Sequence, residues 1–465
     1  MDGFNLLWLR PVRTLVYWSG FPYVFQVLLL VMFVALAVFG WGRFAPDGVD
    51  DKLYAKCNVV TLLIWAVWWP AMIWMAVLLG RAWCTVCPLE LAGNISERIG
   101  RRLGLPQASL PRWVAAGALI VALYALVQFL VAGLHIHRVP HYTALFLVSL
   151  LGLSLVPGLL LKDRAFCRGF CPVGLLLGTY GRGGMLAIRP HTAEVCRDCS
   201  PKDCLLPANR TKLNAGSCPS LLNPSRLDSN RDCLVCCQCI KACQPKENMQ
   251  LLLRRPFHPD DAREVLTSWP VTLFVLLVSG FVTYELCSEY KPAKELFVAV
   301  PHGLAARIGA DALAGWIKGV WMLVVVPLVG WTILGLPTRL LGGATSVREA
   351  WRRLALPLVV IVAAGHMAKG LAKFTSWGAF LPHTLDDPTG VSTAVAFGSG
   401  TAVAPPALLS QGIVSLVGVM LVVAGLLMSL REAKRAGPKR PMLPIVVPLV
   451  AVGLVFAILV LAWGM

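Results

Sequence analysis

The chain has 465 residues, of which 57% are hydrophobic and only 14% are charged, against roughly 25% charged residues in typical globular proteins. Its mean hydropathy of +0.70 excludes a soluble enzyme and a disordered scaffold, because no water-soluble fold buries that much apolar surface. The net charge of +18 would suit a nucleic-acid binder, so the distribution of the charges decides its meaning.

Nine stretches of the chain are long and apolar enough to cross a membrane, because a spanning helix needs about 20 mostly apolar residues. In chain order they are residues 21–41, 59–80, 113–134, 142–161, 269–287, 316–336, 354–374, 408–430 and 442–463. The sequence therefore predicts an all-α polytopic membrane protein with about nine transmembrane helices.

Lys and Arg residues are unevenly divided between the two sets of loops. With the N-terminus inside the cell, 32 of the 42 fall on the cytoplasmic side, as the positive-inside rule requires. Topology then explains the positive charge, and we expect membrane lipid and no nucleic acid as a partner. We predict a multi-pass protein of a bacterial or archaeal inner membrane, with a cytoplasmic N-terminus and the C-terminus outside.

Residues 162–267 break the apolar pattern, hold eleven of the fifteen cysteines and are expected to form a cytoplasmic domain. Before them, two successive pairs of spans each lead to two cysteines followed by proline. The two hairpin motifs are Cys84-x2-Cys87-Pro88 and Cys167-x3-Cys171-Pro172. This repeat indicates a duplicated helical hairpin. We divide the chain into a four-helix module (1–161), the cytoplasmic domain (162–267) and a five-helix module (268–465).

Fifteen cysteines in a long apolar chain favour metal ligation over a disulfide scaffold. The strongest motif is a run with the spacing C-x2-C-x2-C-x3-C. Such a run wraps three thiolates around one [4Fe–4S] cluster, while its fourth cysteine reaches a second cluster. Upstream, a cysteine triplet and a distant fourth cysteine complete the pattern. The crossed assignment gives Cys196, Cys199, Cys204 and Cys243 to cluster 1, and Cys233, Cys236, Cys239 and Cys218 to cluster 2.

Two structural zinc sites are the alternative for these eight cysteines, since thiolate quartets also suit zinc. The crowded C-x2-C-x2-C-x3-C run fits a single tetrahedral ion poorly and a cubane cluster well. Cys237 is an extra thiol in this run that could replace a neighbour. The spacing therefore predicts two [4Fe–4S] clusters in a small α+β ferredoxin-like domain inserted between the fourth and fifth spans.

The four hairpin cysteines, Cys84, Cys87, Cys167 and Cys171, also make a complete ligand set. Three interpretations fit them: a third [4Fe–4S] cluster, redox-active dithiols or a transient copper or iron site, and structural helix ends. If they bind a cluster, the nearby Arg81, Arg168 and Arg182 would offset its negative charge. No Cys-x-x-Cys is followed by His, so we expect no covalently attached c-type haem.

Ionisable residues within a span suggest function. His366, Lys369 and Lys373 share one face of the seventh span, and His135, His137 and His141 lie near the ends of spans three and four. A quinone pocket at His366 and Lys369, a b-type haem between His366 and His135, and a purely structural role are the interpretations that we retain. Histidine suits the first two because it exchanges protons near neutral pH and ligates metals.

Residues 6–253 resemble the membrane polyferredoxins of the NapH/NosR/CcoG type, through the two hairpin motifs and the paired-cluster cysteines that follow. In that family two C-x3-C-P motifs precede a two-cluster ferredoxin domain, and members pass electrons between the quinone pool or cytoplasmic donors and redox partners. The motif at Cys167 fits fully, the one at Cys84 is one residue short, and the five C-terminal spans lie outside the family pattern.

The resulting prediction is a membrane-bound iron–sulfur protein that carries electrons between the quinone pool, or another membrane donor, and a redox partner. We expect a subunit of a respiratory complex bound to other redox proteins, rather than a stand-alone enzyme. Two alternatives stay open: a maturation factor that reduces a metal ion such as copper through the hairpin cysteines, and a redox-sensing membrane regulator.

Overall fold

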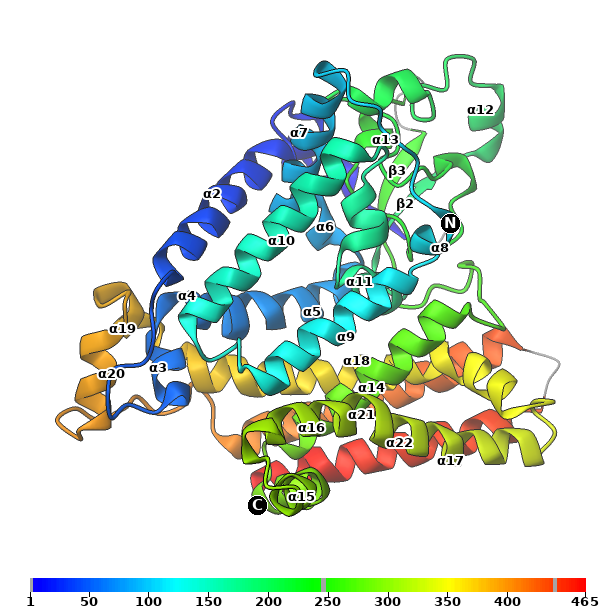
Figure 1. Cartoon of the computed structure of the whole chain (residues 1–465). Coiled ribbons are helices and arrows are strands. Elements are labelled where there is room, and N and C mark those ends of the chain that lie inside the picture. Colours follow the sequence, from blue (N-terminus) through cyan, green and yellow to red (C-terminus); the bar gives the residue numbers. More distant parts are fainter. Residues whose placement is uncertain (1–2, 244–247, 438–440) are drawn as a thin grey trace. The chain divides into compact units, whose positions relative to one another are not determined.

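The structure is a computed structural model, and it describes residues 3–243, 248–437 and 441–465. It is 68% helical with few strands. Among the described residues, eight helical stretches are long and apolar enough to cross a membrane (Figure 1). They are Tyr23–Gly40, Val59–Leu79, Pro140–Leu160, Trp269–Cys287, Asp311–Leu340, Val347–Gly378, Gln411–Ala436 and Leu443–Gly464. The predicted helical, multi-pass character is confirmed.

The remaining predicted span, at 113–134, forms a shorter apolar helix. Helix α8 (Arg112–Ala115) and helix α9 (Ala118–Gly133) share this stretch, and Gly117 separates them at a φ of +98°. Only glycine adopts such a backbone freely, so the helix is broken there. Helix α9 keeps 16 residues, about 24 Å of helix against a hydrocarbon core of roughly 30 Å.

Three strands and short helices join these spans. The strands are β1 (Phe4–Asn5), β2 (Leu186–Pro190) and β3 (Met249–Leu253). The helices up to residue 241 are α1 (Arg10–Tyr17), α2 (Tyr23–Gly40), α3 (Asp51–Cys57), α4 (Val59–Thr61), α5 (Trp69–Leu79), α6 (Ala82–Val86), α7 (Pro88–Arg102), α10 (Pro140–Leu160), α11 (Gly174–Gly181), α12 (Ala193–Asp198) and α13 (Gln238–Lys241). Later helices are α14 (Trp269–Cys287), α15 (Lys291–Arg307), α16 (Ala314–Val320), α17 (Val326–Leu340), α18 (Val347–Gly378), α19 (Leu381–Asp386), α20 (Val391–Gly398), α21 (Gln411–Ala436) and α22 (Leu443–Leu461).

The chain forms two compact units. The first unit contains Met1–Val34, Trp74–Ile120 and Ser149–Ala262, and the second contains Ala35–Ile73, Val121–Val148 and Arg263–Met465. The first unit therefore holds twelve thiols of the candidate clusters, and the second holds His366 and Lys369. The division of the chain into three successive domains stays a prediction.

A small antiparallel sheet ties the N-terminus of the first unit to its cysteine-rich segment. Its strand order is β1-β3-β2, with Phe4 opposite Leu253 and Leu186 opposite the same residue. The Lys241 ammonium in α13 donates hydrogen bonds to the carbonyls of Trp18 (2.8 Å) and Phe21 (2.6 Å). The N-terminal segment and the cysteine-rich segment therefore form one folded body.

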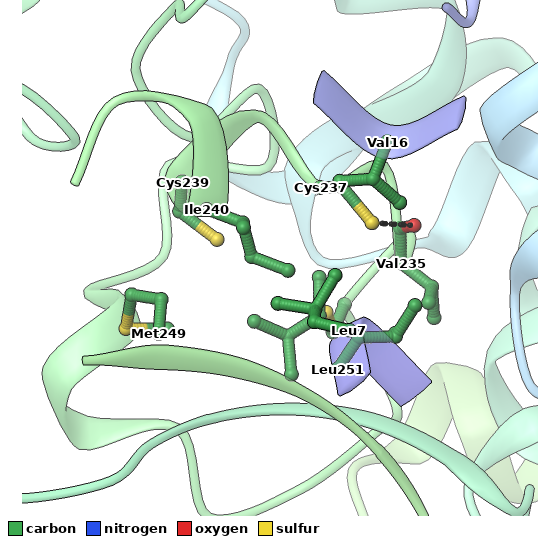
Figure 2. Close-up of a cluster of buried hydrophobic side chains, with 10 residues drawn as sticks. Leu7, Val16, Val235, Cys237, Cys239, Ile240, Met249 and Leu251 are labelled. Carbon is green, nitrogen blue, oxygen red and sulfur yellow. Dashed lines mark hydrogen bonds between the residues drawn. The ribbon is translucent and has the colours of Figure 1, made fainter. Parts of the chain in front are cut away.

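The apolar core of this body lies beside the candidate ligands (Figure 2). Leu7 and Val16 from the N-terminal segment pack with Ile240 of α13 and Leu251 of β3. Cys237 belongs to the same core: it is 2% exposed, and its thiol donates to the Val235 carbonyl at 3.4 Å. The N-terminal residues thus supply apolar surface that the short cysteine-rich segment lacks.

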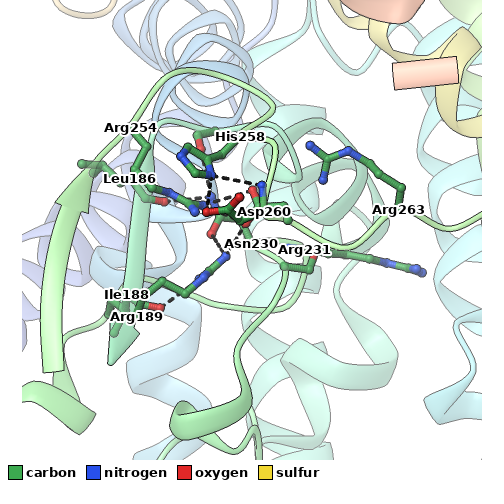
Figure 3. A network of polar contacts seen from close by, with 12 residues as sticks. Leu186, Ile188, Arg189, Asn230, Arg231, Arg254, His258, Asp260 and Arg263 are labelled. Atoms are coloured by element: carbon green, nitrogen blue, oxygen red, sulfur yellow. Dashed lines mark hydrogen bonds and ion pairs between the residues drawn. The ribbon is translucent and has the colours of Figure 1, made fainter. Parts of the chain in front are cut away.

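A buried polar network holds the ends of β2 and β3 together (Figure 3). The carboxylate of Asp261 pairs with Arg189 at 2.8 Å and with Arg254 at 2.9 Å. Arg189 also donates to the side chain of Asn230, which in turn donates to the carbonyls of Gly184 and Leu186 at 2.8 and 3.0 Å. Asn230 lies three residues before Cys233, so the network positions the chain that enters the cysteine run.

Helix α18 is the central helix of the second unit, since 89% of its most apolar window is buried. It packs against α14, α17, α21 and α22. Small residues permit the closest approach: a Cβ added to Gly425 of α21 would lie 2.6 Å from the Ala364 side chain of α18. Such contacts between small residues are typical of helices packed in membranes.

The segment 376–406 is rich in Gly, Pro, Ser and Thr, a composition typical of irregular backbone, yet it contains the helices α19 and α20. Asp387 explains the second helix, because its carboxylate accepts hydrogen bonds from the backbone of Gly390 and Thr393 and from the hydroxyl of Ser392. A side-chain carboxylate that caps free N–H groups in this way favours a helix start. A local cap therefore outweighed the turn-forming composition.

Candidate metal centres

The two hairpin motifs have the same local structure. In each, a short helical turn ends at a cysteine in extended conformation, with ψ of 124° at Cys87 and 112° at Cys171. A proline follows each cysteine, and the residue before proline is sterically driven into extended backbone. Pro88 then opens α7, a position where its missing N–H costs nothing. Proline therefore fixes the point at which each cysteine leaves its turn.

A π-helical turn explains why the second motif is one residue longer. Residues Phe166–Phe170 form this turn, and the Cys171 N–H bonds the Phe166 carbonyl at 2.8 Å, five residues back. The equivalent turn of the first motif, Ala82–Val86, is α-helical. A π turn accommodates one extra residue in a helix. The shorter motif at Cys84 is thus compatible with a matching pair of cysteine turns.

The four hairpin thiols lie within electrostatic range of one another. Burial raises the pKa of Cys171 to about 12, with further contributions from the charges of Cys167 and Cys84. Burial likewise raises the pKa of Cys87 far above its usual value, together with the charges of the other three thiols. Two motifs that are about 80 residues apart in the chain therefore face each other.

Two buried charges next to these thiols were missed in the sequence. The Arg164 guanidinium pairs with the Glu90 carboxylate at 3.0 Å, and both side chains are less than a tenth exposed. Arg164 also donates to the Cys167 sulfur at 3.6 Å, and Arg81 donates to the Cys84 thiol. The only sequence signal for Arg164 was its place three residues before Cys167.

The other two arginines proposed for charge compensation have different contacts. Arg168 donates to the Asp163 carbonyl at 3.4 Å. The Arg182 guanidinium lies over the Phe257 ring, 6.0 Å from its centre. Within the predicted set, Arg81 contacts a candidate thiol, and Arg164 adds a second cation beside these thiols.

A second group of four thiols comes from the cysteine run and its distant partner. Its members are Cys218, Cys233, Cys236 and Cys239. Burial raises the pKa of Cys239, and the charges of the other three members and of Cys237 raise it further. Cys237 is therefore a fifth thiol beside this group. Val235 and Cys237 have left-handed backbone, with φ of +58° and +59°. For a β-branched residue such as valine this conformation is strained, and strain of this kind clusters at functional sites.

A third group contains the upstream triplet and the last cysteine of the run. Its members are Cys196, Cys199, Cys204 and Cys243. Burial raises the pKa of Cys204 to about 11, and the charges of the other three thiols add to the shift. Asn248 donates a hydrogen bond to the Cys196 sulfur at 3.0 Å. A cavity of about 300 Å³ is lined by all four cysteines.

The thiols of each group are spread more widely than the ligands of a single ion. No three His, Cys, Asp or Glu side chains in the described ranges are placed to share one metal ion. A cubane cluster is larger than one ion and carries a thiolate at each of its four irons. The crossed assignment of two clusters and the third cluster on the hairpin thiols both stay predictions.

His366 and Lys369 of the second unit line one cavity, with His135 and His137. The Trp69 indole N–H lies 3.4 Å from the His366 Nε2. His141 lies elsewhere, where its Nδ1 accepts the Gly42 N–H at 3.0 Å. The quinone and haem hypotheses for this cavity stay predictions.

Comparisons with known proteins agree with the hairpin motifs. A family model for a 4Fe-4S binding domain matches residues 61–106 and 143–190, the two segments that carry the hairpin cysteines. The putative electron transport protein YccM of Escherichia coli K12 is 25% identical over 325 residues, which cover 58% of this chain and 87% of YccM.

Two ferredoxin-type proteins are also similar. NapH of Escherichia coli K12 is 26% identical over 180 residues, which cover 35% of this chain and 59% of NapH. NapH of Haemophilus influenzae is 24% identical over 184 residues, covering 38% and 63%. No solved structure matches the chain. The resemblance to ferredoxin-type membrane proteins is confirmed, as is the presence of a 4Fe-4S binding domain.

Proposed function

We propose that this relative of ferredoxin-type membrane proteins transfers electrons through three [4Fe–4S] clusters. The observation that carries the proposal is that twelve cysteines from distant parts of the first unit gather in three groups of four, with Cys237 as a fifth thiol beside one of them. A bound cluster of this type supplies one-electron transfer at a potential set by its protein surroundings. The hairpin group would hold the third cluster, beside the two of the cysteine-rich segment.

The donor set of the hairpin group suits a cluster with four thiolates. Four negative sulfurs in a buried place need nearby positive charge, since an uncompensated buried charge is costly. Arg81 and Arg164 supply it through direct contacts to Cys84 and Cys167. The Glu90 carboxylate, with Gln26 and Asn94 bound to it, keeps Arg164 in position.

The finer proposal concerns the route of the electrons. We infer that they pass between the quinone pool, or another membrane donor, and a redox protein, and that this chain is a subunit of a respiratory complex. The N-terminal segment pairs with β3, which supports placing it and the cysteine-rich segment on one side of the membrane. The positive-inside rule makes that side the cytoplasm.

The alternative function is a maturation factor whose hairpin thiols reduce a metal ion such as copper. The measurement that separates the two is iron and acid-labile sulfide per chain on anaerobically purified full-length protein. Three clusters predict about twelve of each. About eight of each would leave the hairpin thiols free and overturn the three-cluster proposal in favour of the alternative.

Two cysteine variants sharpen this experiment. Cys84→Ser should lower the iron content by about four atoms per chain and remove one component of the spectrum of the reduced protein. Cys237→Ser is the matched control, because Cys237 donates to a backbone carbonyl in the apolar core. An unchanged iron content in Cys84→Ser, or an equal loss in both variants, would contradict the hairpin assignment.

A further inference from the structure

The second unit contains a cavity that the proposed function does not use. Its volume is about 280 Å³, at the lower end of ligand pockets, which range over roughly 300–1,000 Å³. The residues around it come from α3, α5, α9, α14, α15, α16 and α18 and from the adjoining turns. Cavities between membrane helices that carry ionisable residues mark functional sites.

The charge around this cavity is strongly unbalanced. Seven basic and two acidic side chains line it. The basic ones are Lys52, Lys56, Arg138, Lys294, Lys318, Lys369 and Lys373, and the acidic ones are Glu285 and Glu289. With neutral histidines, five positive charges are in excess. Lining residues of a membrane protein are seldom so one-sided unless a charge of opposite sign is bound there.

Both carboxylates are already used by one lysine. The Lys369 ammonium lies 3.2 Å from the Glu285 carboxylate, pairs with Glu289, and donates to the Ser288 hydroxyl at 2.7 Å. Lys369 is only 8% exposed, so this double pairing compensates its own burial. Both carboxylates therefore pair with Lys369, and the described residues show no ion pair between them and the other six cations.

Two of these other cations lie within membrane-spanning helices. Lys318 stands over the Tyr284 ring at 5.4 Å and Lys373 over the Trp377 ring at 4.8 Å. No ion pair with a carboxylate is found for either among residues 3–243, 248–437 and 441–465. Contact with an aromatic face recovers only part of the cost of removing an ammonium from water. An anion in the cavity would supply the rest.

Groups at the edge of the cavity respond to this positive potential. Burial lowers the pKa of His135 to about 4, and the cations Arg138, Lys318 and Lys52 contribute to the shift. Burial and the charges of Lys52 and Arg138 also lower the pKa of Lys294. The neighbouring cations therefore disfavour the protonated forms of His135 and Lys294, because like charges repel.

His137 provides a neutral donor for the same ligand. Its Nε2 accepts a hydrogen bond from Arg138 at 3.2 Å, so in the neutral ring the proton belongs to Nδ1. That Nδ1 is buried and has no hydrogen-bond partner in the described part of the chain. A buried N–H without a partner costs free energy, and a ligand oxygen would satisfy it.

Aromatic side chains form the remaining wall. Trp65, Trp69, Phe281 and Trp377 line the cavity, and the Phe281 ring lies against that of His366 at 5.7 Å. Flat apolar faces of this kind bind a planar body by stacking and burial. The cavity thus presents cations to one part of a ligand and aromatic rings to another.

We propose that this cavity binds an anion with a flat apolar body and a carboxylate or similar oxyanion, held by Lys318, Lys373, Arg138 and the His137 Nδ1–H. This site goes beyond the proposed electron transfer and stands independently of the iron count. A neutral quinone, the ligand predicted from His366 and Lys369, would fill the same space and leave the excess charge uncompensated.

The test is equilibrium dialysis of purified full-length protein in phosphatidylcholine nanodiscs, with empty nanodiscs subtracted. The probe is 2-naphthoate, and 2-naphthamide is its neutral counterpart of nearly the same shape. We expect 2-naphthoate to bind at least about tenfold more tightly, since one lost charge interaction of ordinary strength corresponds to that factor. Equal affinity of the two, or no saturable binding of 2-naphthoate, would overturn the proposal.

Variants locate the site. Lys318→Met and Lys373→Met keep the length of the side chain and remove a cation without a carboxylate partner, so folding should be unharmed. Each should weaken 2-naphthoate binding by about tenfold. Lys291→Met is the control, because Lys291 is 85% exposed and faces Glu295. Unchanged affinity in both cavity variants would refute this location.

Competition identifies the source of the anion. Displacement of 2-naphthoate by inorganic phosphate would support the anion site and show that an oxyanion alone suffices. Weaker binding in nanodiscs with phosphatidylglycerol would support it with a lipid headgroup as the occupant. Insensitivity to both would support a soluble organic anion whose flat body is required.

Discussion

The two units carry their chemistry in different ways. In the first unit, twelve candidate ligands come from short sequence motifs, and most lie within four residues of another ligand. In the second unit, Arg138 comes from a turn, Lys318 and Lys373 come from two separate helices, and the three meet only in the folded chain. A candidate site made of residues that are close in sequence can be predicted before the fold is known. A candidate site made of residues that are far apart in sequence cannot.

The backbone that carries the candidate residues also differs between the two units. Around Cys236 the chain is left-handed at Val235 and Cys237, so irregular backbone directs the thiols. In the second unit Lys318 and Lys373 stand on the helices α16 and α18, and Arg138 stands in the turn after α9. Their distances depend on how these elements pack. A single substitution should therefore act locally in the first unit and through helix packing in the second.

The largest expected effect is on the iron content that the cysteine motifs are proposed to hold. Cys239→Ser removes a thiol that is 7% exposed and faces three others, so the chain should lose about four iron atoms. Iron analysis and the spectrum of the reduced protein measure this loss. Retention of all the iron would show that Cys237 replaces Cys239, and the double variant Cys237→Ser/Cys239→Ser would then lose it.

The next effect tests a charge outside the cysteine motifs. Arg164→Gln leaves the Glu90 carboxylate buried without its cation, and breaking a buried pair costs about 3–5 kcal/mol. The free energy of unfolding in detergent should fall by that order. The double variant Glu90→Gln/Arg164→Gln should recover the part of the loss that the unpaired Glu90 carboxylate causes, while the contact of Arg164 to Cys167 stays lost. If the double variant is no better than the single one, the pair is not the cause.

A smaller effect is expected from helix packing in the second unit. Gly425→Leu places side-chain atoms where a Cβ alone would lie 2.6 Å from Ala364, and overpacking of this kind costs about 1–3 kcal/mol. The unfolding free energy should fall while the iron content stays unchanged. Gly412→Leu is the control, because nothing lies within 4 Å of a Cβ there. A loss of iron in Gly425→Leu would break the comparison between the units.

The smallest effect concerns the helices α19 and α20. Burial raises the pKa of Asp387, but hydrogen bonds from Ser392, Thr389 and Thr393 outweigh it and hold the pKa below its usual range. The ionised carboxylate therefore stabilises this segment above pH of about 4, and the stabilisation is lost as the pH falls further.

Asp387→Ala should cost about 1 kcal/mol, as the loss of a cap does. Faster amide hydrogen exchange in α20 at neutral pH would report it. Asp386→Ala, next to it on the exposed side of α19, should leave the exchange unchanged. Equal protection of α20 in the wild type and Asp387→Ala would mean that the cap is dispensable.

The sequence sufficed for the features that depend on local pattern. Apolar length located the spans, with Gly117 as the exception that shortened one of them. Cysteine spacing predicts which thiols share a cluster, and that assignment stays a prediction. Arg164 and Glu90 escaped prediction because their pairing joins two hairpins. The cation excess of the cavity escaped it because charges from five helices and two turns must be summed. The helix α20 escaped it because composition hid the cap at Asp387.

The pairing of β1 with β3 has a consequence for biosynthesis. Phe4 and Asn5 are synthesised about 250 residues before their partners, Leu253 and Leu252. At 5–20 residues per second β1 waits roughly 12–50 s for its partner, and three long apolar helices and the shorter α9 are synthesised in that interval. The cysteine-rich segment cannot complete its core before Leu7 and Val16 join it. Assembly of the metal centres thus depends on keeping residues 4–16 available until translation has passed residue 253.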